Sequence, residues 1–83
     1  MSKFIFEDFS IVFRVDLVTP ELLGKKFRLH SNDIFLFNAE TGYVHGQKHG
    51  IFHPKLKNGE VYDVYGNTET IPISRKNFIR KQV

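Results

Sequence analysis

The sequence predicts a mainly β fold: a small barrel of about five or six strands, or a strongly bent antiparallel sheet, with one or two short helical turns. Two observations carry this prediction. Apolar and polar residues alternate along short segments with the period of two that a strand requires. Turn signals separate these segments, namely the loop 38–42, Asn58-Gly59 and Gly66-Asn67. Closure or bending would also hide the strand edges of so short a chain.

The clearest predicted strand is the segment 9–17. Phe9, Ile11, Phe13, Val15 and Leu17 fall on one face of it, and mostly polar residues fall on the other. This alternation predicts one continuous strand with its phenylalanine face toward the core. The segment 4–6 either extends this strand or forms a short strand of its own.

Residues 19–24 predict a single helical turn. Thr19 is a good N-cap, Pro20 suits the first helical position and Gly24 can end the turn. Residues 25–30 then alternate between basic and apolar side chains. We therefore expect an edge strand over this second segment.

A hairpin is predicted over residues 34–45, with a dense apolar strand at 34–37, a loop at 38–42 and a return strand at 43–45. A brief strand follows at 51–53. The Asn58-Gly59 pair predicts a type I′ hairpin turn, because both residues tolerate positive φ. Lys57 and Glu60 would pair across this turn, and a strand over 61–65 would leave it.

The Gly66-Asn67 pair turns the chain into a last predicted strand at 68–73, which Pro72 places at a sheet edge or near a strand end. Residues 70–79 resemble the end of an SH3-like barrel. In that family a proline-containing strand leads into a 3₁₀ turn and then into an aromatic and aliphatic final strand. The resemblance implies a fold only, and no ligand-binding residue is transferred from it.

The predicted core consists of the apolar face of these segments: Phe9, Ile11, Phe13, Val15, Leu17, Phe27, Leu29, Phe35, Phe37, Val44, Val64, Ile71, Ile73 and Ile79. A chain of 83 residues predicts a single small β domain over residues 1–83. Its nine Phe and three Tyr allow a small core to bury a large apolar area. The chain has no Cys, which excludes disulfides and thiolate chemistry.

The sequence contains no apolar stretch near the ~20 residues that a membrane span needs. Its first residues also lack the pattern of a signal peptide. We therefore expect a cytoplasmic protein with no membrane contact. No catalytic or cofactor motif is recognisable, so we expect a non-catalytic protein without a cofactor.

Charge is distributed unevenly along the chain. The net charge is +3, and residues 1–42 hold five Lys or Arg and six Asp or Glu, whereas residues 43–83 hold seven and three. The basic excess lies in two windows without acids, 44–58 and 74–83. Such an asymmetry is an argument about binding partners.

Cations beside aromatic rings are the combination that binds single-stranded nucleic acid, because lysine and arginine contact phosphates while rings stack on bases. We expect four rings to be exposed near the cations, those of Tyr43, Phe52, Tyr62 and Tyr65. The predicted nucleic-acid site comprises Lys48, Lys55, Lys57, Tyr62, Arg75, Lys76, Arg80 and Lys81.

Two other functions fit the composition. The first is a protein-binding adaptor or inhibitor that uses an edge strand or an aromatic groove, with residues 25–30 or the strand containing Pro72 as the edge. The second is a small metal-independent ribonuclease, for which His45, His49, His53, Lys48 and Asp63 supply suitable residue types.

His45, His49 and His53 recur at intervals of four residues. On a helix this spacing would let two imidazoles bind one metal ion. The intervening glycines disfavour a helix, and on a strand such positions lie about 13 Å apart. We therefore predict no metal site, and expect a polar hairpin whose histidines face solvent.

Overall fold

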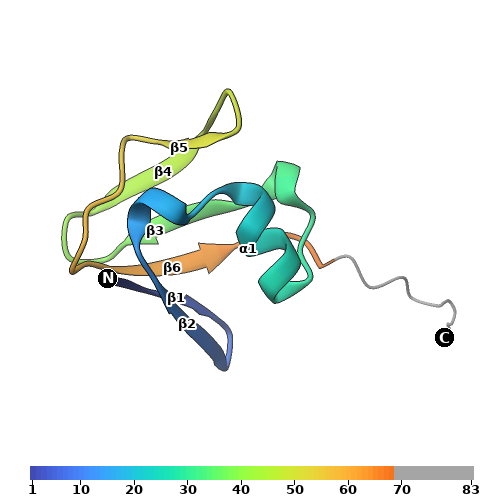
Figure 1. Ribbon diagram of the computed structural model, residues 1–83, viewed down its shortest axis with the longest axis horizontal. Helices are drawn as coiled ribbons and strands as arrows, with labels where there is room; N and C mark the ends of the chain where they lie inside the picture. Colours follow the sequence, from blue (N-terminus) through green and yellow to red (C-terminus); the bar gives the residue numbers. More distant parts are fainter. Residues whose placement is uncertain (69–83) are drawn as a thin grey trace, which may run out of the picture.

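The computed structural model describes residues 1–68, which form one mixed sheet of six strands in the order β2-β1-β6-β3-β4-β5 (Figure 1). The prediction of a mainly β fold is confirmed. The strands are β1 (Ser2–Phe6), β2 (Phe9–Phe13), β3 (Phe35–Asn38), β4 (Tyr43–Lys48), β5 (Ile51–His53) and β6 (Val61–Tyr65). The helical elements are α1 (Pro20–Phe27) and two 3₁₀ turns, η1 (Val15–Leu17) and η2 (Ser31–Asp33).

Within residues 1–68 the sheet is open rather than closed into a barrel, because β2 and β5 stand at opposite ends of the strand order. The sheet is also not purely antiparallel, since β1 and β6 run in parallel. The resemblance to an SH3-like barrel over 70–79 and the predicted core residues Ile71, Ile73 and Ile79 lie outside the described residues. The predicted strand 68–73 lies almost entirely outside them.

The predicted strand 9–17 is shorter than expected, and the part that forms, β2, makes a hairpin with β1. β1 is a separate strand, and it pairs antiparallel with β2 in a register that places Phe4 opposite Ile11 and Phe6 opposite Phe9. Glu7, at φ 54°, turns the chain between the two strands. β2 ends at Phe13, and the chain then forms η1 over residues that were expected to continue the strand.

β1 lies parallel to β6, with Phe4 opposite Tyr62. The two rings stack with centroids 5.5 Å apart and planes 17° apart. Gly59, at φ 90°, occupies the predicted turn, but its backbone N–H donates to the Met1 carbonyl. The predicted hairpin through Asn58-Gly59 is wrong, and with it the Lys57–Glu60 pair across that hairpin, because β5 pairs with β4 while β6 pairs with β1 and β3.

The predicted hairpin over 34–45 is confirmed as β3 and β4. The Asn38 side-chain oxygen accepts hydrogen bonds from the backbone N–H groups of Glu40 and Thr41, and Gly42 closes the loop at φ 78°. β4 continues beyond the predicted return strand and forms a second hairpin with β5. Two left-handed residues, His49 and Gly50, make the turn between these strands, as a type I′ turn requires.

Helix α1 begins as predicted, with Thr19 Oγ1 accepting a hydrogen bond from the Leu22 backbone N–H. Gly24 does not end it, and α1 runs on through Phe27. Arg28 adopts the left-handed conformation, and the Leu29 N–H donates to the Gly24 carbonyl at 2.9 Å. This bond is the six-to-one bond of a Schellman cap. The edge strand predicted over 25–30 is therefore wrong.

The core lies between one face of the sheet and the segments that cover it, among which α1 contributes Leu23 and Phe27 (Figure 1). Its buried apolar residues are Phe4, Val18, Leu23, Phe27, Leu29, Ile34, Leu36, Phe52, Leu56, Tyr62 and Val64. Of the predicted core, Phe27, Leu29 and Val64 are confirmed. Ile11, Phe13 and Val15 are partly buried at its margin.

The predicted core is wrong on β3, where Leu36 is buried and Phe35 is 40% exposed. All four residues from 34 to 37 are apolar, so the sequence carries no alternation that selects a face. Phe37 shares the face of Phe35 and is half-buried. Phe9, Leu17 and Val44 were also placed in the core and are exposed.

The other face of the sheet carries exposed apolar side chains. Phe35 and Tyr65 lie opposite each other on β3 and β6, and their rings stack at 5.1 Å. Val12, Val44 and Val61 are also exposed on this face.

Alanine substitutions on neighbouring residues of β3 test the assignment of the two faces. Leu36→Ala empties a fully buried site and should lower the free energy of unfolding by about 2–5 kcal/mol. Phe35→Ala removes an exposed ring and should cost only about 0.5–1.5 kcal/mol, the value of an aromatic pair. Urea unfolding of both variants measures this, and a larger loss for Phe35→Ala would reverse the faces.

Gly24→Ala separates intrinsic helix propensity from packing. Propensity alone predicts stabilisation of about 1 kcal/mol, since alanine is the better helix former. A Cβ at Gly24 would lie 2.9 Å from the Leu29 carbonyl oxygen, a backbone atom that must shift. We therefore expect a lower midpoint in thermal unfolding, and a raised midpoint would contradict the close approach of this cap.

Candidate functional site

A pocket opens at the end of the sheet where the β3–β4 loop faces the loop from Pro54 to Glu60. Its volume is about 130 Å³. The strands contribute aromatic and polar side chains to it, and the loop contributes two lysines. The lining residues are Asn38, Thr41, Tyr43, His45, Pro54, Lys55, Lys57, Glu60 and Tyr62.

His45 joins the two walls of this pocket. It is 3% exposed on the buried face of β4, and its Nδ1 lies 2.6 Å from the Pro54 carbonyl oxygen. A carbonyl only accepts hydrogen bonds, so Nδ1 must donate, and Nε2 is the acceptor of the neutral ring. The His45 ring meets Tyr62 edge to face at 5.3 Å and Tyr43 at 6.4 Å. Three aromatic rings therefore contribute to one surface.

Tyr62 holds the loop in place. Its side chain is 1% exposed, and its hydroxyl accepts a hydrogen bond from the Lys57 backbone N–H at 2.8 Å. Ser2 Oγ donates to the Lys57 carbonyl at 2.9 Å. Leu56 is buried while Lys55 and Lys57 are exposed, so the loop anchors itself through one side chain and presents two cations.

A hydrogen bond between Asn38 and Glu60 forms part of the polar lining. Asn38 is 3% exposed, and its Nδ2 donates to Glu60 Oε1 at 2.7 Å. The Asn38 side chain therefore binds two loops, because its oxygen accepts from the β3–β4 loop and its nitrogen donates to Glu60. In the described part of the chain, Glu60 is the one acid that lines the pocket.

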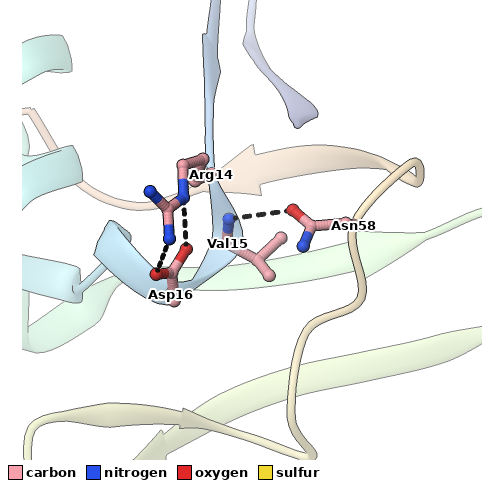
Figure 2. Close-up of polar contacts among 4 residues, drawn as sticks. All are labelled: Arg14, Val15, Asp16 and Asn58. Carbon is pink, nitrogen blue, oxygen red and sulfur yellow. Dashed lines mark hydrogen bonds and ion pairs between the residues drawn. The ribbon is translucent and has the colours of Figure 1, made fainter.

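The loop is also tied to the segment that follows β2. Figure 2 shows the Asn58 side chain reaching toward the backbone of Val15, whose N–H donates to Asn58 Oδ1 at 3.3 Å. Beside this contact Arg14 and Asp16 form an ion pair at 2.7 Å, with both side chains more than half exposed. An exposed pair of this kind adds about 0–1 kcal/mol. The bond from Asn58 is what links the two segments.

Of the predicted nucleic-acid residues, the structure brings Lys55, Lys57 and Tyr62 together at the pocket. Lys48 lies at the far end of β4, and the strand alternation places it on the opposite face from His45. The predicted residues Arg75, Lys76, Arg80 and Lys81 lie outside the described residues.

The expected exposure of the aromatic rings is only partly right. Tyr62 and Phe52 are buried, so neither offers a free face for a base. Tyr43 is 61% exposed at the pocket, whereas Tyr65 is exposed on the opposite face of the sheet. Tyr43 is therefore the ring that stands both open and close to the two lysines.

The charge balance of the described part is neutral. Residues 1–68 hold equal numbers of Lys or Arg and of Asp or Glu, so the excess of positive charge comes from residues 69–83. The two pocket lysines are thus a local concentration of positive charge in a part of the chain that is neutral as a whole.

The histidines of the 45–53 segment do not share a surface. His45 is on the buried face of the sheet, His49 is in a turn, and His53 lies opposite Gly46 on the other face. Exposure is confirmed for His49 and His53 and wrong for His45. Asp63 alternates with the buried Tyr62 and Val64, so it also faces away from His45. Residues 1–68 contain no group of three or more potential metal ligands.

Asn38 and Glu60 were not predicted as site residues. Tyr43 was expected as an exposed ring near the cations and His45 as a candidate for a ribonuclease site, but neither was placed in the predicted nucleic-acid site. A signal for the latter two is present, because Tyr43 and His45 are two positions apart on a strand and share a face. Neither protein-family models nor curated proteins nor solved structures match the chain. In the part of the chain that the structure describes, no helix is long and apolar enough to cross a membrane.

Removing the Tyr62 hydroxyl tests its role as the anchor of the loop. Tyr62→Phe deprives the Lys57 N–H of its acceptor and should lower the free energy of unfolding by about 0.5–1.5 kcal/mol. It should also speed hydrogen exchange at the Lys57 amide. Tyr43→Phe removes an exposed hydroxyl and serves as the matched control, with an effect within about 0.5 kcal/mol. Equal effects of the two variants would argue against the anchor.

Proposed function

We propose that this protein is a non-catalytic binding module for single-stranded nucleic acid, and that the pocket holds one base of the strand. The observation that supports the proposal most is that two exposed lysines, Lys55 and Lys57, line the same pocket as three aromatic rings, those of Tyr43, His45 and Tyr62. Cations beside an aromatic recess suit a ligand that is anionic on one side and flat and apolar on the other.

Different pocket residues bind different parts of a nucleotide. The ammonium groups of Lys55 and Lys57 contact the phosphates, and a base stacks on the exposed ring of Tyr43. Stacking of this kind contributes about 1–3 kcal/mol per base. The Glu60 carboxylate accepts hydrogen bonds from the exocyclic amine of a base. A free amine is present on adenine, cytosine and guanine, so this contact would favour them over uracil and thymine.

The cations of residues 69–83 add a second contribution. Arg75, Lys76, Arg80 and Lys81 carry the positive excess of the chain, so they supply attraction to phosphates that is independent of base identity. The pocket supplies the specific part of the binding.

The first experiment titrates labelled single-stranded RNA and DNA at several salt concentrations. The slope of log K against log salt is negative, and replacing both Lys55 and Lys57 with Ser should reduce its magnitude by about 1.4, since each phosphate contact contributes about 0.7. Lys48→Ser, on the opposite face of the sheet, controls for the loss of a single charge and should leave the slope unchanged. Replacing Arg75, Lys76, Arg80 and Lys81 with Ser should weaken binding to all sequences alike.

Tyr43→Ser separates stacking from charge. It should weaken binding by about 5-fold to 150-fold without changing the salt slope, whereas Tyr65→Ser, at the exposed ring on the opposite face, should leave affinity unchanged. Absence of binding by the wild-type chain at low salt would refute the proposed function. Equal losses for Tyr43→Ser and Tyr65→Ser would refute this pocket as the site.

A further inference from the structure

A second surface, independent of the pocket, lies along β2. In residues 1–68 this strand pairs with β1 on one side and with no strand on the other. A free strand edge presents backbone groups that can pair with another chain. The edge strands expected from the sequence were elsewhere, so β2 is a new candidate for this role.

The register shows which backbone groups of β2 are free. Phe6 and Phe9 close a two-residue turn, so they form a hydrogen-bonded pair, and the bonded pairs of an antiparallel ladder recur at every second residue. Phe9, Ile11 and Phe13 therefore bond to β1. The N–H and C=O groups of Ser10 and Val12 point away from β1, toward the open edge.

A groove runs beside this edge. Its volume is about 340 Å³, and its walls are Phe9, Ser10 and Ile11 of β2 and Lys26, Phe27 and Arg28 at the end of α1. Phe9 is 66% exposed there. A strand added to β2 would direct alternate side chains into this groove, because successive side chains of a strand point to opposite faces.

The charge of the groove restricts its occupant. Among residues 1–68, Lys26 and Arg28 line it and no acid does. Lys26 Nζ also lies 5.7 Å above the ring of Phe13, so one of the two cations stands directly over β2. An apolar side chain would contact Phe9 and Ile11, and a carboxylate two positions along the added strand would meet these cations.

We propose that β2 and the groove beside α1 form a docking site for an extended segment of a partner protein, which adds to the sheet next to β2. The groove-facing positions of that segment carry apolar and acidic side chains. Residues 69–83 of this chain are basic, and β2 of a second copy, Phe9–Phe13, carries no acid. Neither complements Lys26 and Arg28, so charge favours a separate acidic partner.

The test selects peptides from a random linear-peptide display library on the full chain and measures the affinity of a labelled selected peptide. Val12→Pro removes the outward N–H and keeps the bonds between β2 and β1. Val12→Ala is its matched control, because it truncates the same exposed side chain and keeps the N–H. We expect the peptide to bind Val12→Pro at least tenfold more weakly than Val12→Ala. Unfolding curves establish that both variants are folded.

A second pair of variants tests the charge. Lys26→Gln should weaken the peptide several-fold, whereas Lys25→Gln, which removes the same charge from a residue that lines a different hollow, should leave the affinity unchanged. Only every second amide of an added strand faces β2. N-methylation of the peptide residues whose amides face β2 should therefore abolish binding, whereas N-methylation of the residues between them should leave it intact.

Three results would overturn the proposal. The library could yield no peptide, or peptides without acidic residues. Val12→Pro could bind as tightly as Val12→Ala. The chain could instead form a dimer that Val12→Pro dissolves, which would assign the β2 edge to a second copy. We expect Val12→Pro to leave nucleic-acid binding unchanged in every case, since β2 contributes no residue to the pocket.

Discussion

The parallel pairing of β1 with β6 is the contact on which the rest of the structure depends. It joins the N-terminal hairpin to the β6-β3-β4-β5 part of the sheet. Phe4 is fully buried at this junction and stacks on Tyr62. Two backbone bonds extend the pairing into the preceding loop, from Gly59 to Met1 and from Lys3 to Glu60. An isolated hairpin is only marginally stable in water, whereas a sheet of three or more strands with one covered face can be stable by itself.

Both candidate binding surfaces follow from this pairing. Because β1 occupies an inner position, β2 becomes the edge strand and stands beside the end of α1. Because Tyr62 is held against Phe4, its hydroxyl reaches the Lys57 backbone and fixes the loop that carries the two pocket lysines. The pocket and the edge lie in different parts of the molecule, which allows one partner at each.

Sequence reasoning succeeded where the signal was local. The Thr19 cap and the loop closed by Asn38 and Gly42 rest on contacts within a few residues, and both formed as predicted. Sequence reasoning failed where contacts between distant segments determine which strands pair. Asn58-Gly59 forms a turn, but the strand that leaves it pairs with the chain terminus, which no local pattern encodes. Lys55 and Lys57 were recognisable by charge, whereas the burial of Tyr62 depends on its pairing with Phe4.

Nuclear Overhauser spectroscopy on the folded chain tests the central pairing most directly. We expect backbone cross-peaks that link Phe4 with Tyr62 and its chain neighbours in the pattern of parallel strands. In a mixture of isotope-labelled and unlabelled protein, these cross-peaks should arise within one molecule. Cross-peaks that join β5 to β6 across Asn58-Gly59, or β1–β6 cross-peaks that arise only between molecules, would contradict this pairing.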